Sequence, residues 1–155
     1  MGANISTEYE ANGSTMNKDL VVTCNGSSAK NGRNIVSNGS SSASKGRVLA
    51  FHSSSKWKIH FEASKLTSNL MVVDFKASWC GPSRSMEPAM NEFSAKYTDV
   101  HFIKIDVDEL EDVAKDFGIQ IMPTFILIKK GEEVDKLVGA NKEELRKKIE
   151  KYRAQ

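Results

Sequence analysis

The stretch SWCGPSRSMEPAM, residues 78–90, holds one half of a disulfide-exchange site. Such exchange begins when a thiolate attacks a disulfide sulfur, and a second nearby thiol then releases the product. Cys80 supplies the first sulfur, but Ser83 occupies the position where a Cys-x-x-Cys pair carries the second. The Ser83 hydroxyl lies one helical turn on, where it could donate a hydrogen bond to the Cys80 thiolate.

Cys80 is placed where a helix can lower the pKa of its thiol. The apolar run at 70–77 predicts a buried strand before it, and residues 83–97 predict a helix after it. The unpaired N–H groups at a helix start favour a thiolate, and there a cysteine pKa falls from about 8.5 to roughly 3.5–7.5. Gly81 lets a partner's backbone come close, and Pro82 suits the start of a helix.

Two further residues are candidates for the same site. Asp74 interrupts the apolar run, where an unpaired charge is costly, so its carboxyl pKa should be raised and suited to moving protons. The alternative is a carboxyl satisfied by local hydrogen bonds without a chemical role. Pro123, in the stretch IMPTF just before a strand, suits a turn that a cis peptide bond could form.

Cys24 is the only other cysteine, and two interpretations of it stay open. It is either an idle thiol in a flexible tail or a distant resolving thiol for Cys80. A flexible coil spans about 5–6 Å × √n, so the 22 residues from 25 to 46 reach roughly 23–28 Å, enough for the two sulfurs to meet. Two cysteines do not make a disulfide framework, which fits a reducing compartment.

The periodicity of the chain predicts a mixed sheet covered by helices on both faces. The residues before 47 are rich in Ser, Asn and Gly, so we expect a disordered extension at 1–46 and one compact α/β domain at 47–155. The expected order is βαβαβαββα. The predicted elements are strands at 47–52, 70–77 and 100–107, helices at 55–66, 83–97 and 110–118, a hairpin at 124–139 turning at Gly131, and a last helix opened by Asn141.

Composition and charge exclude several function classes. With 22 basic and 20 acidic residues, the net charge of +2 is too small to indicate a nucleic-acid partner. No apolar run approaches the roughly 20 residues that span a bilayer, and no secretory signal is visible. The histidines and acidic residues show no metal-ligand spacing. We therefore expect a cytoplasmic protein without metal or cofactor, with export routes other than a signal peptide left open.

Residues 47–155 resemble the thioredoxin family, and most nearly its plant h-type members. The resemblance is carried by VVDFKASWCGPS, KIDVDE and MPTF, and by GEEV followed by VGA. It implies the thioredoxin fold, with Cys80 as nucleophile, Asp74 as the buried proton-transfer carboxyl, Lys104 beside Asp74, and a cis Pro123. The implied groove for a substrate backbone is formed by Trp79, Met122, and the loop around Gly139 and Ala140.

Ser83 is the departure from the family pattern, because the family's second cysteine resolves the mixed disulfide. We expect a one-cysteine exchange enzyme that acts on protein disulfides or glutathionylated thiols, with glutathione or another external thiol for release. The first alternative is a binding module whose groove holds clients while its catalysis is vestigial. The second is an engineered Cys-to-Ser trapping variant of a dithiol thioredoxin.

The N-terminus carries a separate motif. MGANIS satisfies the M-G-x-x-x-[ST] pattern for N-myristoylation, with Gly2 as the modified residue. Several h-type thioredoxins resemble it in having such a glycine and an N-terminal extension. One myristoyl chain gives only marginal membrane binding, so we expect a peripheral membrane pool beside a soluble one.

Overall fold

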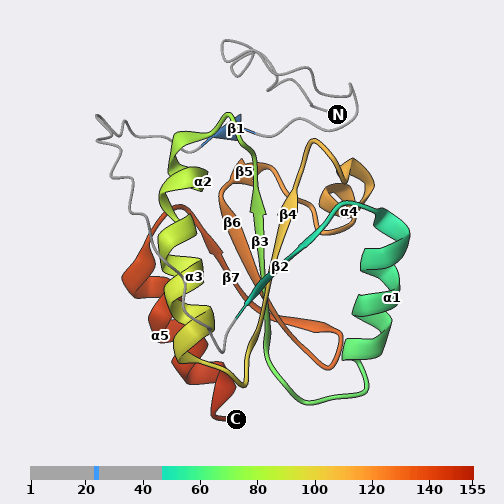
Figure 1. Cartoon of the computed structure of the whole chain (residues 1–155), viewed down its shortest axis with the longest axis vertical. Coiled ribbons are helices and arrows are strands. Elements are labelled where there is room, and N and C mark those ends of the chain that lie inside the picture. Colours follow the sequence, from blue (N-terminus) through green and yellow to red (C-terminus); the bar gives the residue numbers. More distant parts are fainter. Residues whose placement is uncertain (1–22, 25–46) are drawn as a thin grey trace.

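The computed structural model describes residues 23–24 and 47–155. Its elements follow the predicted order, with one short strand added before the domain and another inside it (Figure 1). They are β1 (Thr23–Cys24), β2 (Val48–Phe51), α1 (Ser54–Ser64), β3 (Met71–Lys76), α2 (Gly81–Ser85), α3 (Glu87–Lys96), β4 (His101–Asp106), α4 (Glu111–Asp116), β5 (Ile121–Met122), β6 (Thr124–Lys129), β7 (Glu132–Val138) and α5 (Lys142–Arg153).

Five strands form the central mixed sheet in the order β2-β4-β3-β6-β7. Strands β2, β4 and β3 are parallel, whereas β6 runs antiparallel to β3, and β7 antiparallel to β6. Helices α1 and α4 cover one face and α3 and α5 the other (Figure 1). The predicted α/β architecture with helices on both faces is therefore confirmed.

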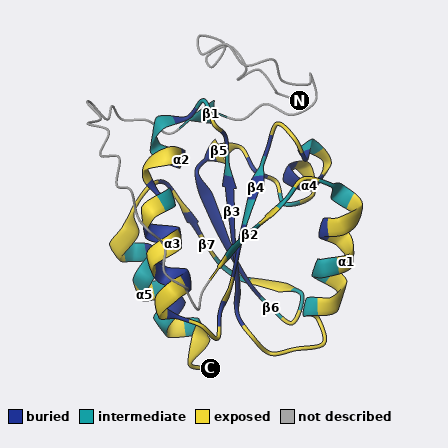
Figure 2. Cartoon of the chain, viewed as in Figure 1, coloured by how far each residue is buried: buried dark blue, intermediate teal, exposed yellow. Residues whose placement is uncertain are grey.

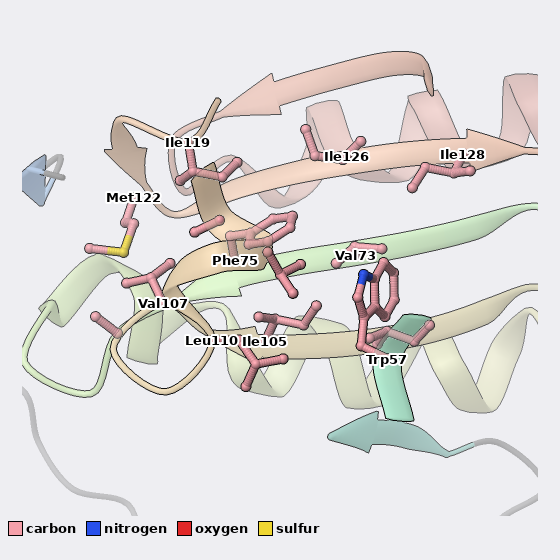
Figure 3. Close-up of a cluster of buried hydrophobic side chains, with 14 of the residues drawn as sticks. Trp57, Val73, Phe75, Ile105, Val107, Leu110, Ile119, Met122, Ile126 and Ile128 are labelled. Atoms are coloured by element: carbon pink, nitrogen blue, oxygen red, sulfur yellow. The ribbon is translucent and has the colours of Figure 1, made fainter. Parts of the chain in front are cut away.

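Strand β3 lies at the centre of the sheet, which explains its unbroken apolar sequence. All but the last of its residues are buried, because β4 and β6 flank it and helices cover both of its faces (Figure 2). Val73 and Phe75 point into one apolar cluster, with Trp57 of α1 and Ile105 of β4 (Figure 3). This rigid strand ends just before the loop that carries Cys80.

The predicted helices differ from the observed ones in two places. The predicted helix at 83–97 is two helices: α2 ends at Ser85, and Pro88 lies in the first turn of α3. Proline suits a first turn because its missing N–H has no partner there in any case. The predicted helix at 55–66 is α1, which ends at Ser64. Trp57 is buried, but Ile59 and, beyond the helix end, Leu66 are 71% and 86% exposed, so these two apolar residues at a helical spacing do not face the core.

The predicted hairpin turn at Gly131 and the predicted start of the last helix at Asn141 are confirmed. Gly118 follows α4 with φ +67°, and Gly131 turns the hairpin between β6 and β7 with φ +82°. Both values lie in the left-handed region that glycine adopts without strain. The side chain of Asn141 accepts a hydrogen bond of 3.0 Å from the Glu144 N–H and so caps α5.

Strand β1 pairs in parallel with β5 in a small sheet of its own. Its residues belong to the extension at 1–46 that we expected to be disordered. The structure gives Thr23 and Cys24 a defined place beside the domain, and the other residues of that segment lie outside the described ones. Within the described ranges, no helix has the length and apolar character that crossing a membrane requires.

Candidate functional site

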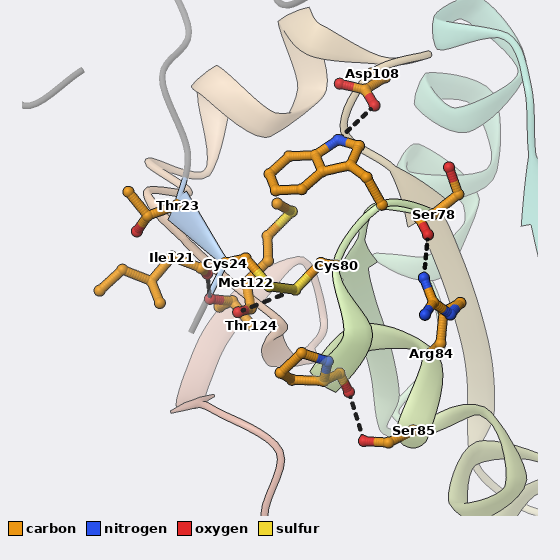
Figure 4. The surroundings of a disulfide bond; sticks show 12 residues. Thr23, Cys24, Ser78, Cys80, Arg84, Ser85, Asp108, Ile121, Met122 and Thr124 are labelled. Atoms are coloured by element: carbon orange, nitrogen blue, oxygen red, sulfur yellow. Dashed lines mark hydrogen bonds between the residues drawn. A yellow bond between two sulfur atoms is a disulfide. The ribbon is translucent and has the colours of Figure 1, made fainter. Parts of the chain in front are cut away.

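The centre of the candidate site is a disulfide between Cys24 and Cys80 (Figure 4). Their Cα atoms are 5.4 Å apart, within the range that a disulfide needs. Cys80 has no exposed surface, and Cys24 packs against the same apolar cluster. Position 83 carries a serine and so supplies no sulfur. The second sulfur of the site comes instead from Cys24, in the N-terminal extension.

The loop and helix that follow β3 hold Cys80 in place. Cys80 is the N-cap of α2, and its backbone is extended, with φ −101° and ψ 112°. Its N–H donates to the Ala77 carbonyl at 3.1 Å, and its own carbonyl accepts from the Arg84 N–H at 3.1 Å. Arg84 Nη1 also donates to the Ser78 carbonyl at 2.7 Å, which closes the loop over the start of the helix (Figure 4).

The cis-proline turn at Met122–Pro123 lies next to Cys80. The Met122–Pro123 bond is cis, as the sequence and the resemblance suggested. The Met122 carbonyl oxygen lies 3.8 Å from Cys80 Sγ (Figure 4). A disulfide sulfur carries no proton, so this contact can become an S–H···O hydrogen bond only when Cys80 is a free thiol.

Ser83 is fully buried, and its Oγ has no hydrogen-bond partner among the described residues. No hydrogen bond joins it to Cys80 in this disulfide form, so the predicted donation to a thiolate stays a prediction for the reduced form. Buried hydroxyls are seldom left unpaired, and the exceptions in native proteins call for an explanation such as a catalytic role. Ser83 Oγ, one turn beyond Cys80, is such an unpaired buried atom among the described residues.

Asp74 is buried in the middle of β3, and its Oδ1 is the other buried side-chain atom without a partner among the described residues. Burial raises the pKa of this carboxyl from 3.8 to about 7. The raised pKa agrees with the position of Asp74 in an apolar run, and a carboxyl with a pKa of about 7 is partly protonated at neutral pH.

Lys104 lies directly opposite Asp74 in the pairing of β3 with β4. Its charge lowers the pKa of Asp74, but two other charges have larger effects on it. Lys76 lowers this pKa and Glu87 raises it, and their side chains lie 3.5 Å apart, from Nζ to Oε2. Sequence reasoning missed this pair, although the two-residue spacing places Lys76 on the same side of β3 as Asp74.

Trp79 is held beside the site by a residue that sequence reasoning also missed. The indole Nε1 donates a hydrogen bond of 3.0 Å to Asp108 Oδ2, from the loop after β4 (Figure 4). Partial burial raises the pKa of Asp108 against the opposing effect of this bond. The contact of Asp108 with Trp79 joins two loops that are distant in the sequence, so it depends on the tertiary fold.

The remaining predicted groove residues lie at the same end of the sheet. Gly139, with φ +110°, donates its N–H to the Pro123 carbonyl at 2.8 Å, which ties the two predicted loops together. Met122 is fully buried, Ala140 is exposed, and Gly81 and Pro82 are partly exposed at the start of α2. Space is open beside Gly81, since a Cβ there meets no atom within 4 Å. Gly2 lies outside the described residues.

Comparisons with known proteins agree with this geometry. The thioredoxin family profile matches residues 50–151. Thioredoxin H2 of Arabidopsis thaliana is 54% identical over 108 residues, which are 70% of this chain and 81% of that protein. Thioredoxin H7 of the same plant is 42% identical over 153 residues, 99% of both chains. The crystal structure of a Nicotiana alata thioredoxin superposes with a TM-score of 0.69 at 62% identity, covering 74% of this chain and 99% of that one.

Proposed function

We propose, from the premise that this chain belongs to the thioredoxin family, that it is a thiol–disulfide oxidoreductase in which Cys80 is the one thiol that attacks client disulfides. The Cys80 thiolate attacks one sulfur of a client disulfide. A new bond then joins Cys80 to the client, and the other client sulfur leaves as a thiolate that takes up a proton. Glutathionylated thiols are clients of the same kind.

Two routes release the client from Cys80. In the first, a glutathione thiolate attacks Cys80 Sγ, the client leaves as a thiolate, and Cys80 is left bonded to glutathione. A second glutathione attacks the glutathione sulfur of that bond, which gives oxidised glutathione and the free Cys80 thiolate. In the second, the Cys24 thiolate attacks Cys80 Sγ, the client leaves as a thiolate, and the Cys24–Cys80 disulfide forms. Two glutathione molecules, or one molecule of an external dithiol, then reduce that disulfide and restore the starting enzyme.

The disulfide between Cys24 and Cys80 is the observation that favours the second route. Asp74 supports either route, because a carboxyl with a pKa of about 7 can accept a proton from an attacking thiol and return it to a leaving one. The alternative of a binding module with vestigial catalysis predicts that Cys80 is no more reactive than an ordinary cysteine.

A stoichiometric reaction with dithiobis(nitrobenzoate) tests the proposal. Attack by Cys80 releases one coloured nitrothiobenzoate per protein and leaves a second one bonded to Cys80. If Cys24 resolves this adduct, wild-type protein releases the second equivalent in a first-order step that does not depend on protein concentration. The Cys24→Ser variant should stop at one equivalent and release the rest only when glutathione is added.

The matched control is Cys80→Ser, which keeps only Cys24 and should react at the rate of an ordinary exposed thiol. Cys80 should react faster than that control at pH 6, where few unperturbed thiols are ionised. Equal rates for the two single-cysteine variants would support the binding module. A wild-type protein that stops at one equivalent would leave only the glutathione route.

A further inference from the structure

Strand β5 has one strand partner among the described residues, and that partner is β1. The Thr23 N–H donates to the Gln120 carbonyl at 2.8 Å, and Thr23 Oγ1 donates to the same carbonyl at 3.3 Å. One residue on, Cys24 stands opposite Met122, immediately before the cis-proline turn. The Gln120 carbonyl, just before β5, therefore accepts hydrogen bonds from both donors of Thr23, the residue that precedes Cys24.

The register of this pairing decides where the sulfur points. Side chains alternate between the two sides of a strand, so a slip of one residue would turn Cys24 away from Cys80. A disulfide also restricts the separation of the two Cα atoms, which is 5.4 Å here. The two hydrogen bonds from Thr23 hold the register that satisfies both conditions. A segment that reached Cys80 by diffusion alone would sample many other registers.

We propose that Thr23 is a positioning residue for thiol release: it docks its segment on the Gln120 carbonyl at the edge of β5 and so presents Cys24 to Cys80. This inference rests on the proposed role of Cys24 as a resolving thiol. In this role Thr23 is neither an acid nor a base. It raises the fraction of time that the Cys24 thiol spends in the geometry needed to attack Cys80. The backbone N–H makes the shorter bond, and the hydroxyl adds the longer one.

The single-turnover reaction with dithiobis(nitrobenzoate) separates the two bonds. In the second step the Cys24 thiolate attacks Cys80 Sγ, the bond from Cys80 to nitrothiobenzoate breaks, and the aromatic thiolate leaves. Thr23→Pro removes the N–H and the hydroxyl, and a lost hydrogen bond of this kind should slow that step about tenfold. Thr23→Val keeps the N–H and the branched shape, so it should slow the step less than about threefold.

The equilibrium with glutathione gives a second measurement. Docking stabilises the Cys24–Cys80 disulfide as well as the attack that forms it, so Thr23→Pro should lower its formation constant about tenfold, or about 30 mV for this two-electron couple. Thr23→Val should stay close to wild type. Alkylation of Cys80 across pH, measured in Cys24→Ser with and without Thr23→Pro, should not change, because the nucleophile itself is untouched.

Equal second-step rates and equal formation constants for Thr23→Pro and wild type would overturn the positioning role while leaving Cys24 as the resolving thiol. A wild-type protein that forms no Cys24–Cys80 bond, seen by intact mass and peptide mapping after oxidation, would overturn both. A changed alkylation profile in Thr23→Pro would also count against positioning, because it would place the effect at Cys80. The urea midpoint of the reduced protein should be the same for all three chains, since Thr23 lies outside the domain core.

Discussion

Cys24 is bonded to Cys80 across 56 positions of sequence, and the pairing of β1 with β5 places Cys24 opposite Met122. The family position for a second cysteine is only three residues from Cys80, and here it carries the buried Ser83. A thiol three residues away is held near its partner by the helix. A thiol on a separate segment must first dock, so release depends on how that segment binds the domain.

Removing Cys24 should make client adducts persist. In Cys24→Ser, only an external thiol can release the client, so its concentration sets the release rate. Mixed disulfides should appear on non-reducing gels and disappear as glutathione is added, in a dose-dependent way. Wild-type protein under the same conditions should show fewer adducts. Adducts of equal lifetime in the two proteins would mean that Cys24 takes no part in release.

A sulfur at position 83 should replace the missing function. Ser83 Oγ makes no hydrogen bond among the described residues, so Ser83→Cys loses no such bond. In the Cys24→Ser background, Ser83→Cys should remove the adducts without added thiol and support insulin reduction by a thioredoxin reductase. Ser83→Ala in the same background is the matched control and should leave the adducts in place. An inert Ser83→Cys would indicate that the site is a binding surface.

Asp74 should make the protein less stable as the pH rises. Its pKa is raised from 3.8 to about 7 by burial, so between these values the folded protein holds a proton that the unfolded chain has released. Stability is therefore lost from about pH 4 to about pH 7. Asp74→Asn should avoid this loss. Its free energy of unfolding, relative to that of wild type, should therefore rise by on the order of 4 kcal/mol between pH 4 and pH 8. Urea unfolding of the reduced proteins at several pH values measures this change. A difference in unfolding free energy between the two proteins that stays constant with pH would contradict the raised pKa of Asp74.

The charges of Lys76 and Glu87 should shift the pKa of Asp74 in opposite directions. Lys76 lowers that pKa and Glu87 raises it, so Lys76→Met should move it above about 7 and Glu87→Gln should move it below. Lys104→Met should act in the same direction as Lys76→Met but more weakly. The carboxyl carbon of Asp74, followed by NMR across pH, reports the value directly. A larger effect from Lys104 than from Lys76 would restore the cross-strand lysine as the main partner.

We also propose that Gly2 is N-myristoylated and that the protein divides between a membrane-bound and a soluble pool. A single acyl chain binds membranes only marginally, and four basic residues spread through 1–46 add little. Gly2→Ala should shift the bound pool to the soluble fraction. Cell fractionation with metabolic labelling by a myristate analogue measures both the modification and the shift. An unchanged bound fraction in Gly2→Ala would contradict the lipid anchor.

The sequence by itself determined the sheet and most of its covering. The apolar run of β3, the turns at Gly118 and Gly131, and the cap at Asn141 are local patterns with local physical causes, so the order of elements followed from them. Cys80 was identifiable as a candidate nucleophile because the buried strand before it and Gly81, Pro82 and the helix start after it are adjacent to it in the sequence. Ile59 and Leu66 did not face the core, because a helical spacing shows that two residues share a face but not what that face contacts.

Only the tertiary structure decided which distant groups meet at the site. The sequence allowed Cys24 to reach Cys80 but did not favour it, because chain length limits the reach of a segment without fixing its docking place. The pairing of β1 with β5 supplies that place. The Trp79–Asp108 bond and the effect of Glu87 on Asp74 likewise join residues from different elements. Hydrogen bonds and charges act over a few ångströms in space, and the folded backbone decides which residues come that close.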